Sequence, residues 1–366
     1  MFPVNNRVLG AEIKKLLHLA IGGLPQMYHD DHQMFCYRTE LKGDVLVKRG
    51  ISRTNTLITL IGIRKAELAG FRSPVEVGPA LNMLAASVTD FDSIGDIGLY
   101  LWLRSMDGPE NVYSNLRIDI GSALNRYPDA QQNRTMELSW FLAGLSEAEL
   151  SCPGIPGYSD AATKAFCLIK TNQESSGLFR HSSPAGSLSG RVRSRIASFA
   201  DQIYPIYAFS RFYEAYAVES ARAHALTCAQ KICELQGPLG QWWWHYDVVE
   251  GAVIGRYPVY SVHQDGMAPM GLFALSRISK VDFAPAIYKG LNWIFGQNEL
   301  NLDLRDAKRS VVWRNIHQSP YKRYLEEAAS FLLGLRPRLV ENSPQVLYEC
   351  HPYHLGWLLF ALADYC

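Results

Sequence analysis

The stretch Ser261-Val-His-Gln-Asp-Gly-Met-Ala-Pro-Met-Gly-Leu-Phe-Ala-Leu275 joins a polar start to a run of small and apolar residues at helical spacing. Five other segments share this pattern, and they begin near Ser52, Asp92, Glu137, Asp201 and Glu349. A helix that is apolar on almost every side is expected to be buried on every side. The six segments therefore predict an inner layer of six helices.

More amphipathic helices are predicted between these segments, at Ala11–Ala20, Val75–Ala86, Ala161–Thr171, Glu219–Leu235 and Phe283–Phe295. Alternation of fully apolar and amphipathic helices is typical of two concentric rings. The predicted fold is an all-α (α/α)6 toroid, a six-hairpin barrel with long loops and a few short strands, such as Asp44–Lys48, at one end. A superhelix of paired helices gives a similar pattern. Its repeat length is more constant, however, whereas the spacing here widens from about 40 to about 90 residues.

The composition favours one globular domain over residues 1–366, with a loop insertion at about 298–345 that carries a helix near Tyr321–Leu335. Hydrophobic residues make up 48% of the 366 residues, which is enough for a full core. The net charge of +1 gives no general attraction to nucleic acid, so no nucleic-acid partner is expected. The oligomeric state is left open.

The expected location is the cytoplasm. No apolar run reaches the roughly 18 residues of a membrane span, and Met1–Ala20 is charged and lacks the apolar core of a signal peptide. The seven cysteines are scattered and form no Cys-x-x-Cys pair, so neither a disulfide framework nor a structural zinc site is predicted.

In a closed ring of hairpins the inner helices begin at one mouth of the barrel, where free N–H groups favour anionic or hydroxyl-rich ligands. The polar and aromatic side chains at these six helix starts are Arg53, Asn55, Asp92, Asp96, Glu137, Trp140, Asp201, Tyr204, Tyr207, His263, Asp265, Glu349, His351 and His354. Acids, histidines and aromatic rings at six separate helix starts predict a binding or catalytic site.

Several of these residues have a structural alternative. Asp92 and Asp265 can each cap a helix, and Asp265 is expected to point to a different face from His263. His263 heads an apolar stripe and can equally be a core histidine. His351 and His354 share one helix face and can hold a metal, but a complete site needs a third ligand. We expect no metal and no cofactor.

Two loops also carry clusters of polar residues. The run Tyr28-His29-Asp30-Asp31-His32 contains potential ligands, but Pro25 and the strand-like Phe35–Arg38 favour an exposed turn. The piece from His181 to Gly190 is rich in Gly, Ser and Pro and is interpreted as a loop that can act as a lid.

The strongest local signal is Gly240-Gln-Trp-Trp-Trp-His-Tyr-Asp247, followed by Arg256-Tyr-Pro-Val-Tyr-Ser-Val-His-Gln-Asp265. Three consecutive tryptophans cannot all face one core, so some are expected to anchor the loop while at least one lines the site. Aromatic faces beside carboxylates and imidazoles suit sugar rings, cations or polyene chains.

The alternation of helices, with aromatic loops on one face, resembles the six-hairpin toroid proteins. That superfamily includes glycoside hydrolases, polysaccharide lyases, sugar epimerases and the related terpenoid-cyclase toroids. The resemblance covers nearly the whole chain and implies a saccharide substrate. It implies general acid/base chemistry, leaving epimerase, lyase and hydrolase open.

The stretch Gly240–Asp247 with Tyr257, Tyr260 and His263 also resembles the helical part of glucuronyl C5-epimerases. This resemblance implies proton transfer at C5 of a uronate by tyrosines and a carboxylate. The sequence lacks a preceding β-rich domain, and the tyrosine spacing matches only approximately. The carboxylate is left open among Asp201, Asp247, Asp265 and Glu349.

These inferences give two sets of candidate residues. The candidate catalytic residues are Asp201, Tyr260, His263 and Tyr246. The candidate substrate-binding residues are Trp242, Trp244, Tyr257, Arg53, Asp92, Tyr204, Asp265, His351 and His354, with aromatic rings stacking on sugar faces and Arg53 receiving a carboxylate.

Two other functions are considered. The run Leu235–Trp242 resembles the Gln-x-x-x-Gly-x-Trp repeat of triterpene cyclases, but it occurs once, and their Asp-x-Asp-Asp motif is absent. A terpenoid-cyclase-like pocket would be lined by aromatics, which the polar helix starts argue against. A non-catalytic glycan-binding scaffold of a polysaccharide assembly system would have an aromatic groove without a paired acid and base.

Overall fold

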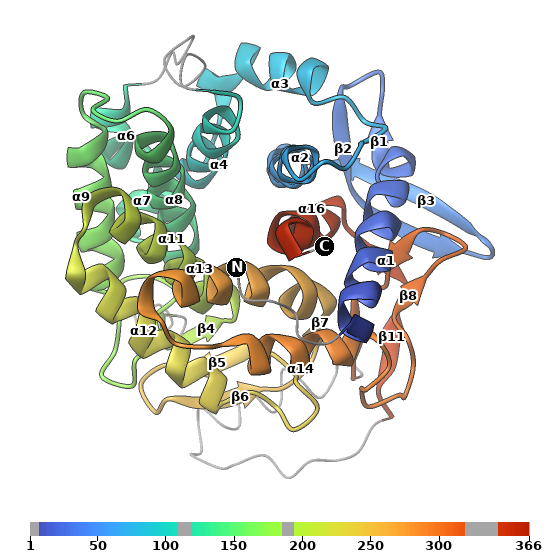
Figure 1. The fold of residues 1–366 in the computed structure, drawn as a ribbon. Helices are drawn as coiled ribbons and strands as arrows, with labels where there is room; N and C mark the ends of the chain where they lie inside the picture. The colour runs from blue at the N-terminus through green and yellow to red at the C-terminus, as the bar shows by residue number, and fades with distance from the viewer. Residues whose placement is uncertain (1–6, 109–118, 185–193, 319–342, 366) are drawn as a thin grey trace.

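The computed structural model describes residues 7–108, 119–184, 194–318 and 343–365. Within these ranges, six inner helices form a ring: α2 (Arg53–Leu68), α4 (Ile94–Ser105), α8 (Thr135–Ser151), α11 (Ala200–Tyr216), α13 (Ala268–Ser279) and α16 (Pro352–Leu362). The chain before α13 forms the π-helical turn η3 (His263–Met267). Each inner helix packs on the next in this order, and α16 packs on α2 to close the ring (Figure 1).

An outer layer surrounds this ring and returns the chain, so the inner helices run in one direction. Its members are α1 (Arg7–Gly23), α3 (Val77–Ala86), α6 (Ile120–Arg126) with α7 (Pro128–Gln131), α9 (Tyr158–Lys170), α12 (Glu219–Glu234) and α14 (Ala284–Ile294). Single 3-10 turns lie at η1 (Pro25–Met27), η2 (Val88–Asp90) and η4 (Ala363–Tyr365).

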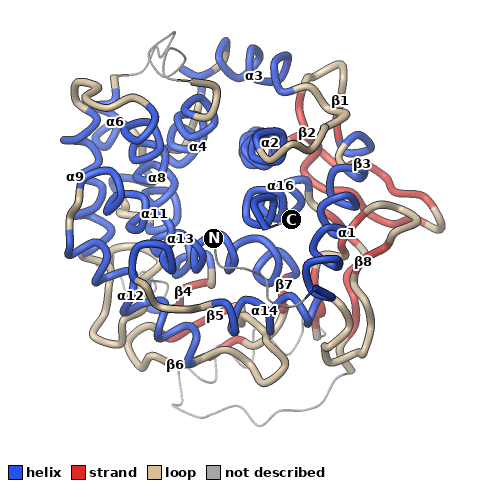
Figure 2. Tube along the Cα trace, viewed as in Figure 1, coloured by secondary structure: helices blue, strands red, loops and turns tan. Residues whose placement is uncertain are grey.

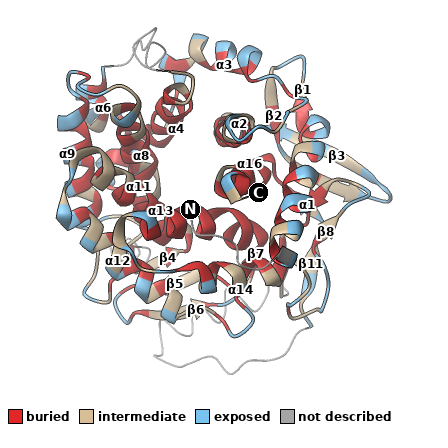
Figure 3. Ribbon diagram, viewed as in Figure 1, coloured by how far each residue is buried: buried red, intermediate tan, exposed pale blue. Residues whose placement is uncertain are grey.

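The burial of the two layers follows from their sequences. Every residue of α4 from Ile94 to Leu103 is buried. In α12, by contrast, the buried residues recur on one face, at Ala221, Ala225, Cys228, Ala229 and Ile232. Figure 3 shows this contrast between buried inner helices and half-exposed outer ones. The predicted (α/α)6 toroid and its six inner helix starts are confirmed, whereas the outer helix α6 was not predicted.

Aromatic rings fill the bore of the inner ring. The Trp102 ring stacks on Tyr207 at 4.7 Å between centroids, and Phe360 packs edge-on against Trp102 at 5.0 Å. Farther along α11, Arg211 is bound by Glu147 of α8, which also accepts a hydrogen bond from the Tyr207 hydroxyl. The bore is therefore closed below its mouth.

Short antiparallel strands lie where the chain enters the inner helices (Figure 2). One sheet has the order β1-β2-β12 with β3 also on β2, a second β11-β10-β7, a third β4-β5-β6, and β8 pairs with β9. The bounds are β1 Tyr28–His29, β2 Met34–Lys42, β3 Val45–Ile51, β4 Ile196–Ser198, β5 His245–Asp247, β6 Ala252–Gly255, β7 Val259–Tyr260, β8 Arg305–Asp306, β9 Val311–Val312, β10 Asn315–His317, β11 Gln345–Leu347 and β12 Glu349–Cys350.

The strands place loop residues at the mouth of the ring. Strand β3 leads into α2, β4 into α11, β7 into η3 and β12 into α16. In the first sheet Cys350 lies opposite Thr39, and in the second Tyr260 lies opposite Asn315. The sheets therefore bring segments that are far apart in the sequence to one end of the barrel.

Three other sequence predictions can be placed. Asp30, Asp31 and His32 form an exposed turn after β1, as expected. The predicted helix near Tyr321–Leu335 and most of the predicted lid (residues 185–190) lie outside the described residues. No helix in the described ranges is long and apolar enough to cross a membrane.

Candidate functional site

A ring of polar side chains lies at the mouth, one from the first turn of each inner helix. It occupies the third residue of α2, α4, α8, η3 and α16 and the second residue of α11: Asn55, Asp96, Glu137, Asp265, His354 and Asp201. Side chains in a helix lean toward its N-terminus, so these groups face the open end of the barrel. We call them the polar ring.

Asp96 is 6% exposed and its carboxylate accepts a hydrogen bond from the Thr54 hydroxyl at 2.7 Å. Burial raises the pKa of Asp96, because desolvation penalises the charged form more than Thr54 and Arg53 favour it. The start of α4, the helix that carries Asp96, is capped by Ser93 and by Asp129. The Asp129 carboxylate accepts a hydrogen bond from the Ile94 amide. Asp96 is therefore free of a capping role.

Glu137 is the neighbouring acid. Its side chain is 12% exposed, and its buried Oε2 has no hydrogen-bond partner among the described residues. Burial raises the pKa of Glu137, and the negative charge of Asp201 raises it further, while Arg134 at 3.8 Å opposes the shift. A carboxyl that has a raised pKa and carries an unused oxygen is suited to act as a general acid.

Asp201 forms a pair with His181. Nδ1 of His181 lies 3.2 and 3.3 Å from the two carboxylate oxygens, and the amide and hydroxyl of Ser198 both donate to Asp201 at 2.8 Å. A carboxylate can only accept, so the proton of this pair lies on Nδ1. Asp201 is 1% exposed and His181 about 20%, so the acid orients the imidazole.

Three aromatic rings lie one helical turn below the polar ring. Trp140, Tyr204 and Trp357 each follow a polar-ring residue by three positions, below Glu137, Asp201 and His354 respectively. The ring centroids of Trp140 and Tyr204 are 5.1 Å apart, those of Tyr204 and Trp357 are 5.9 Å apart, and the Trp357 indole donates to the Tyr204 hydroxyl at 2.9 Å. We call these rings the aromatic floor.

On the other side of the mouth, Asp265 and His354 form a buried pair. Nε2 of His354 donates to the two oxygens of Asp265 at 2.8 and 3.0 Å, and the residues are 3% and 0% exposed. Burial raises the pKa of Asp265, and the nearby imidazole opposes this shift. Asp265 points to a different face from His263, as expected, but it pairs with α16 instead of capping the helix, because the π-helical turn directs it there.

An aromatic wall rises beside η3. The ring of Trp244 stacks on His263 with an interplanar angle of 8° and lies 4.6 Å from Tyr260. Phe199 covers His263 from another side at 4.7 Å. Burial lowers the pKa of His263 to about 3, so this imidazole is neutral at pH 7. His263 therefore belongs to the wall as a core ring.

Arg314 lies at the edge of this wall. Its guanidinium is 5.4 Å from the centre of the Tyr260 ring, and it donates to Glu349 at 2.6 Å. His351 and Arg314 lower the pKa of Glu349 to about 2. His351 is 3.9 Å from Glu349, and burial lowers the pKa of its imidazole to about 4. This part of the mouth carries a fixed cation beside a phenol.

Four other predicted residues lie outside the polar ring. Trp242 is fully buried against Phe199 and anchors its loop. Tyr246 is 1% exposed, and burial, with Cys228 beside it, holds its pKa above the usual range. The Tyr257 hydroxyl donates to Glu299 at 3.0 Å. Asp92 is exposed, so the cap that it was considered for is supplied by Ser93.

Arg53 lies at the rim of the mouth. Its guanidinium stacks 4.7 Å above the Phe91 ring, and it donates to the Asp90 carbonyl at 3.1 Å. Its charge favours the ionised form of Asp96, which places it close to the acid side of the polar ring.

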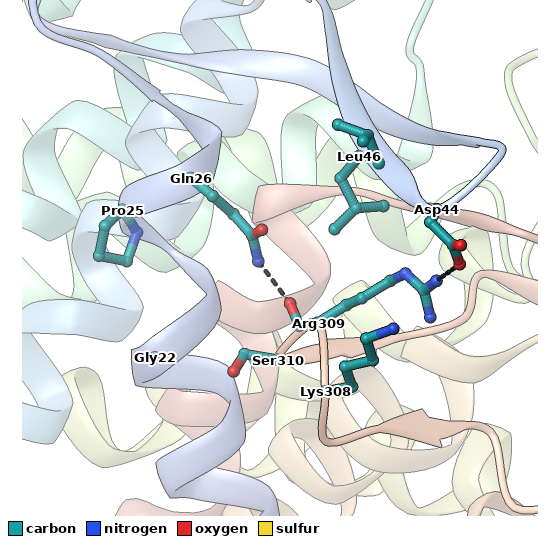
Figure 4. A pocket seen from close by; sticks show the side chains of 9 residues that line it. Gly22, Pro25, Gln26, Asp44, Leu46, Lys308, Arg309 and Ser310 are labelled. Atoms are coloured by element: carbon teal, nitrogen blue, oxygen red, sulfur yellow. Dashed lines mark hydrogen bonds and ion pairs between the residues drawn. The ribbon is translucent and has the colours of Figure 1, made fainter.

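A shallow pocket lies outside the ring of inner helices (Figure 4). Its volume is about 480 Å³, and it lies between the end of α1, the β2–β3 turn and the β8–β9 turn. Arg309 spans it, donating to Asp44 at 2.8 Å, while Gln26 donates to the Arg309 carbonyl. None of its lining residues belongs to the polar ring. In the part of the chain that is described, no cluster of three or more His, Cys, Asp or Glu could hold a metal ion.

No protein-family model matches the sequence, and a search of curated proteins finds no match. Solved structures do match. An unsaturated glucuronyl hydrolase specific for heparin is 16% identical, with a TM-score of 0.57 and 96% of each chain covered. An unsaturated glucuronyl hydrolase from Streptococcus agalactiae is 11% identical, with a TM-score of 0.62 over 98% of this chain and 92% of that one. A sugar epimerase from a ruminal bacterium is 10% identical, with a TM-score of 0.61 over 97% and 98%.

The chain has the six-hairpin toroid fold. Identities of this size show similarity of fold, and the site must be argued from this chain's own residues. Within the toroid, sequence reasoning placed Asp96 and Glu137 at helix starts but did not select them. The signal was an acid in the first turn of an otherwise apolar helix, as in Gly95-Asp96-Ile97. His181 and Arg314 lie in loops and carry no such signal.

Proposed function

We propose that the protein is a carbohydrate-active enzyme that hydrolyses a glycosidic bond in a uronate-containing saccharide by general acid/base catalysis at the polar ring. The observation that carries this proposal is Glu137, a largely buried carboxyl with a raised pKa and an unpartnered oxygen beside an aromatic floor. A carboxyl that protonates a leaving oxygen near neutral pH needs a raised pKa.

The surrounding residues fit defined roles in this reaction. Asp201 lies on the same side of the mouth, and its negative charge adds to burial in raising the pKa of Glu137, while His181 beside it opposes this shift. Trp244 and Tyr260 offer ring faces for a sugar. Arg314 and Arg53 offer charges for a carboxylate of the substrate.

The similarity to solved structures supports the same class of substrate. Two of the structures that share the toroid are described as unsaturated glucuronyl hydrolases, and one as a sugar epimerase. A second candidate function is proton transfer at a carbon atom, as in an epimerase or a lyase. It is favoured by the Tyr260 phenol, whose ring centre lies 5.4 Å from the Arg314 guanidinium, because a phenol beside a fixed cation can take part in proton transfer.

Mass spectrometry of an oligosaccharide panel tests the proposal. The panel contains saturated and unsaturated uronate-terminated disaccharides and longer glucuronate oligosaccharides. We expect products that have gained one water. An unsaturated product would indicate a lyase, and an unchanged mass with altered stereochemistry an epimerase. Binding without any turnover would support a glycan-binding scaffold instead.

A further inference from the structure

The Asp265–His354 pair has no part in the acid chemistry described above, although it belongs to the same polar ring. Both residues are almost fully buried, and the pair joins η3 to α16 at the level of Glu137 and Asp96. A buried carboxyl–imidazole pair is costly to desolvate and gives little stability by itself. The position of this pair at the mouth therefore indicates a role in function and not only in stability.

The fold brings this pair together through two local features. Residues His263–Met267 form a π-helical turn, which changes the direction in which Asp265 points. The next residue is Gly266, where a Cβ atom would lie 2.9 Å from the Trp357 Cβ and 3.1 Å from the Leu358 amide nitrogen. Since no side chain separates the backbones there, the carboxylate reaches the imidazole of α16 directly.

The order of the inner helices places this pair opposite Glu137. Going round the ring, α8 and α16 are separated by two helices in either direction, and so are α4 and α13. The aromatic floor spans the same gap, from Trp140 below Glu137 through Tyr204 to Trp357 below His354. A sugar resting on this floor therefore has Glu137 at one side and His354 at the other.

We infer that His354 is a catalytic base, oriented by Asp265, that acts on the face of the sugar opposite Glu137. This inference rests on the proposed hydrolytic function. Because Nε2 is bound to Asp265, Nδ1 is the ring nitrogen left for a proton from water. Such an acid–imidazole pair fixes the tautomer of the base and stabilises its protonated form.

The step balances with water as the only co-reactant. A water O–H bond breaks as its proton passes to Nδ1 of His354, and the water oxygen bonds to the anomeric carbon. The glycosidic C–O bond breaks with its electron pair on the leaving oxygen, which takes the proton of Glu137. One proton is gained and one is lost, and exchange with solvent restores both groups. Attack and departure on opposite faces invert the anomeric configuration.

Kinetics of His354 variants on the uronate-terminated disaccharide test the inference. His354→Ala should lower kcat by about 100-fold or more, and added imidazole should restore part of it. Asp265→Asn should lower kcat with little change in KM. His224→Ala is the matched control, since His224 is a partly buried histidine of α12 paired with Gln173 and should leave kcat unchanged.

Three results would overturn the inference: wild-type kcat in His354→Ala, a product of retained configuration, or no imidazole rescue in a variant that folds. If His354→Ala does not fold, His354→Gln replaces it. If wild-type protein releases nothing from the panel, the proposed function fails. In that case NMR of the ¹⁵N imidazole signals of His354, assigned by comparison with His354→Gln, tests whether His354 contacts the sugar. A shift of these signals on adding the disaccharide supports contact, and no shift excludes it.

Discussion

Gly98 of α4 and Gly144 of α8 lie against each other with no side chain between the two helices. A Cβ atom on Gly144 would overlap the carbonyl of Gly98, and one on Gly98 would overlap the backbone of Phe141. The close approach fixes how far the α4 and α8 starts stand apart. Since Asp96 and Glu137 belong to these starts, the glycine contact sets the spacing of the two acids.

Gly144→Ala should therefore destabilise the protein, by about 1–3 kcal/mol, because the helices must separate to admit a methyl group. Gly10→Ala is the control, since Gly10 is also helical but has nothing within 4 Å of the added Cβ. That change should stabilise by up to about 1 kcal/mol. Urea unfolding of both variants measures the difference, and equal midpoints would contradict the argument.

Glu137→Gln should abolish most turnover while leaving saccharide binding intact. The amide keeps the shape of the side chain but cannot give up a proton, so kcat is expected to fall by about 100-fold or more. Glu149→Gln, at the far end of the same helix, should behave like the wild type. Turnover and calorimetric binding are measured in parallel, and a Glu137→Gln enzyme with normal kcat would remove Glu137 from the mechanism.

Activity should fall as pH rises through the raised pKa of Glu137, since the general acid must be protonated. The same shift affects stability. Between the ordinary value of 4.5 and the raised value, the folded state holds a proton that the unfolded state has lost, so stability declines as pH increases across that window. In Glu137→Gln the decline should be weaker. Unfolding midpoints from pH 4 to pH 8 test this, and identical slopes in both proteins would contradict it.

The tryptophan run allows a matched comparison of binding and stability. Trp242 is fully buried, so Trp242→Ala should cost about 3–5 kcal/mol of unfolding free energy. Trp244 is only partly buried and forms the wall beside Tyr260, so Trp244→Ala should mainly weaken saccharide binding. Thermal unfolding and binding titrations separate the two effects. The assignment fails if Trp242→Ala is the variant that loses affinity at unchanged stability.

The helix starts could be predicted from the sequence because each one combines a polar first turn with an apolar run. The contacts between side chains at these helix starts could not be predicted from the sequence. His181 and Asp201 are separated by 20 residues and a loop whose path no local pattern encodes. Asp265 faces α16 only because the chain forms a π-helical turn, whereas regular α-helical spacing points it elsewhere. Likewise, the loop geometry alone decides which of three adjacent tryptophans stays only partly buried.

The aromatic side chains in the bore leave the toroid open at its mouth only, so the bore is not a channel through the molecule. With Trp102, Tyr207 and Phe360 packed across the bore and the Arg211–Glu147 pair beyond them, a glycan cannot thread through the molecule. In the proposed reaction, substrate and product would therefore use the same opening. The proposed enzyme would trim one chain end per encounter and release its product before the next end can enter.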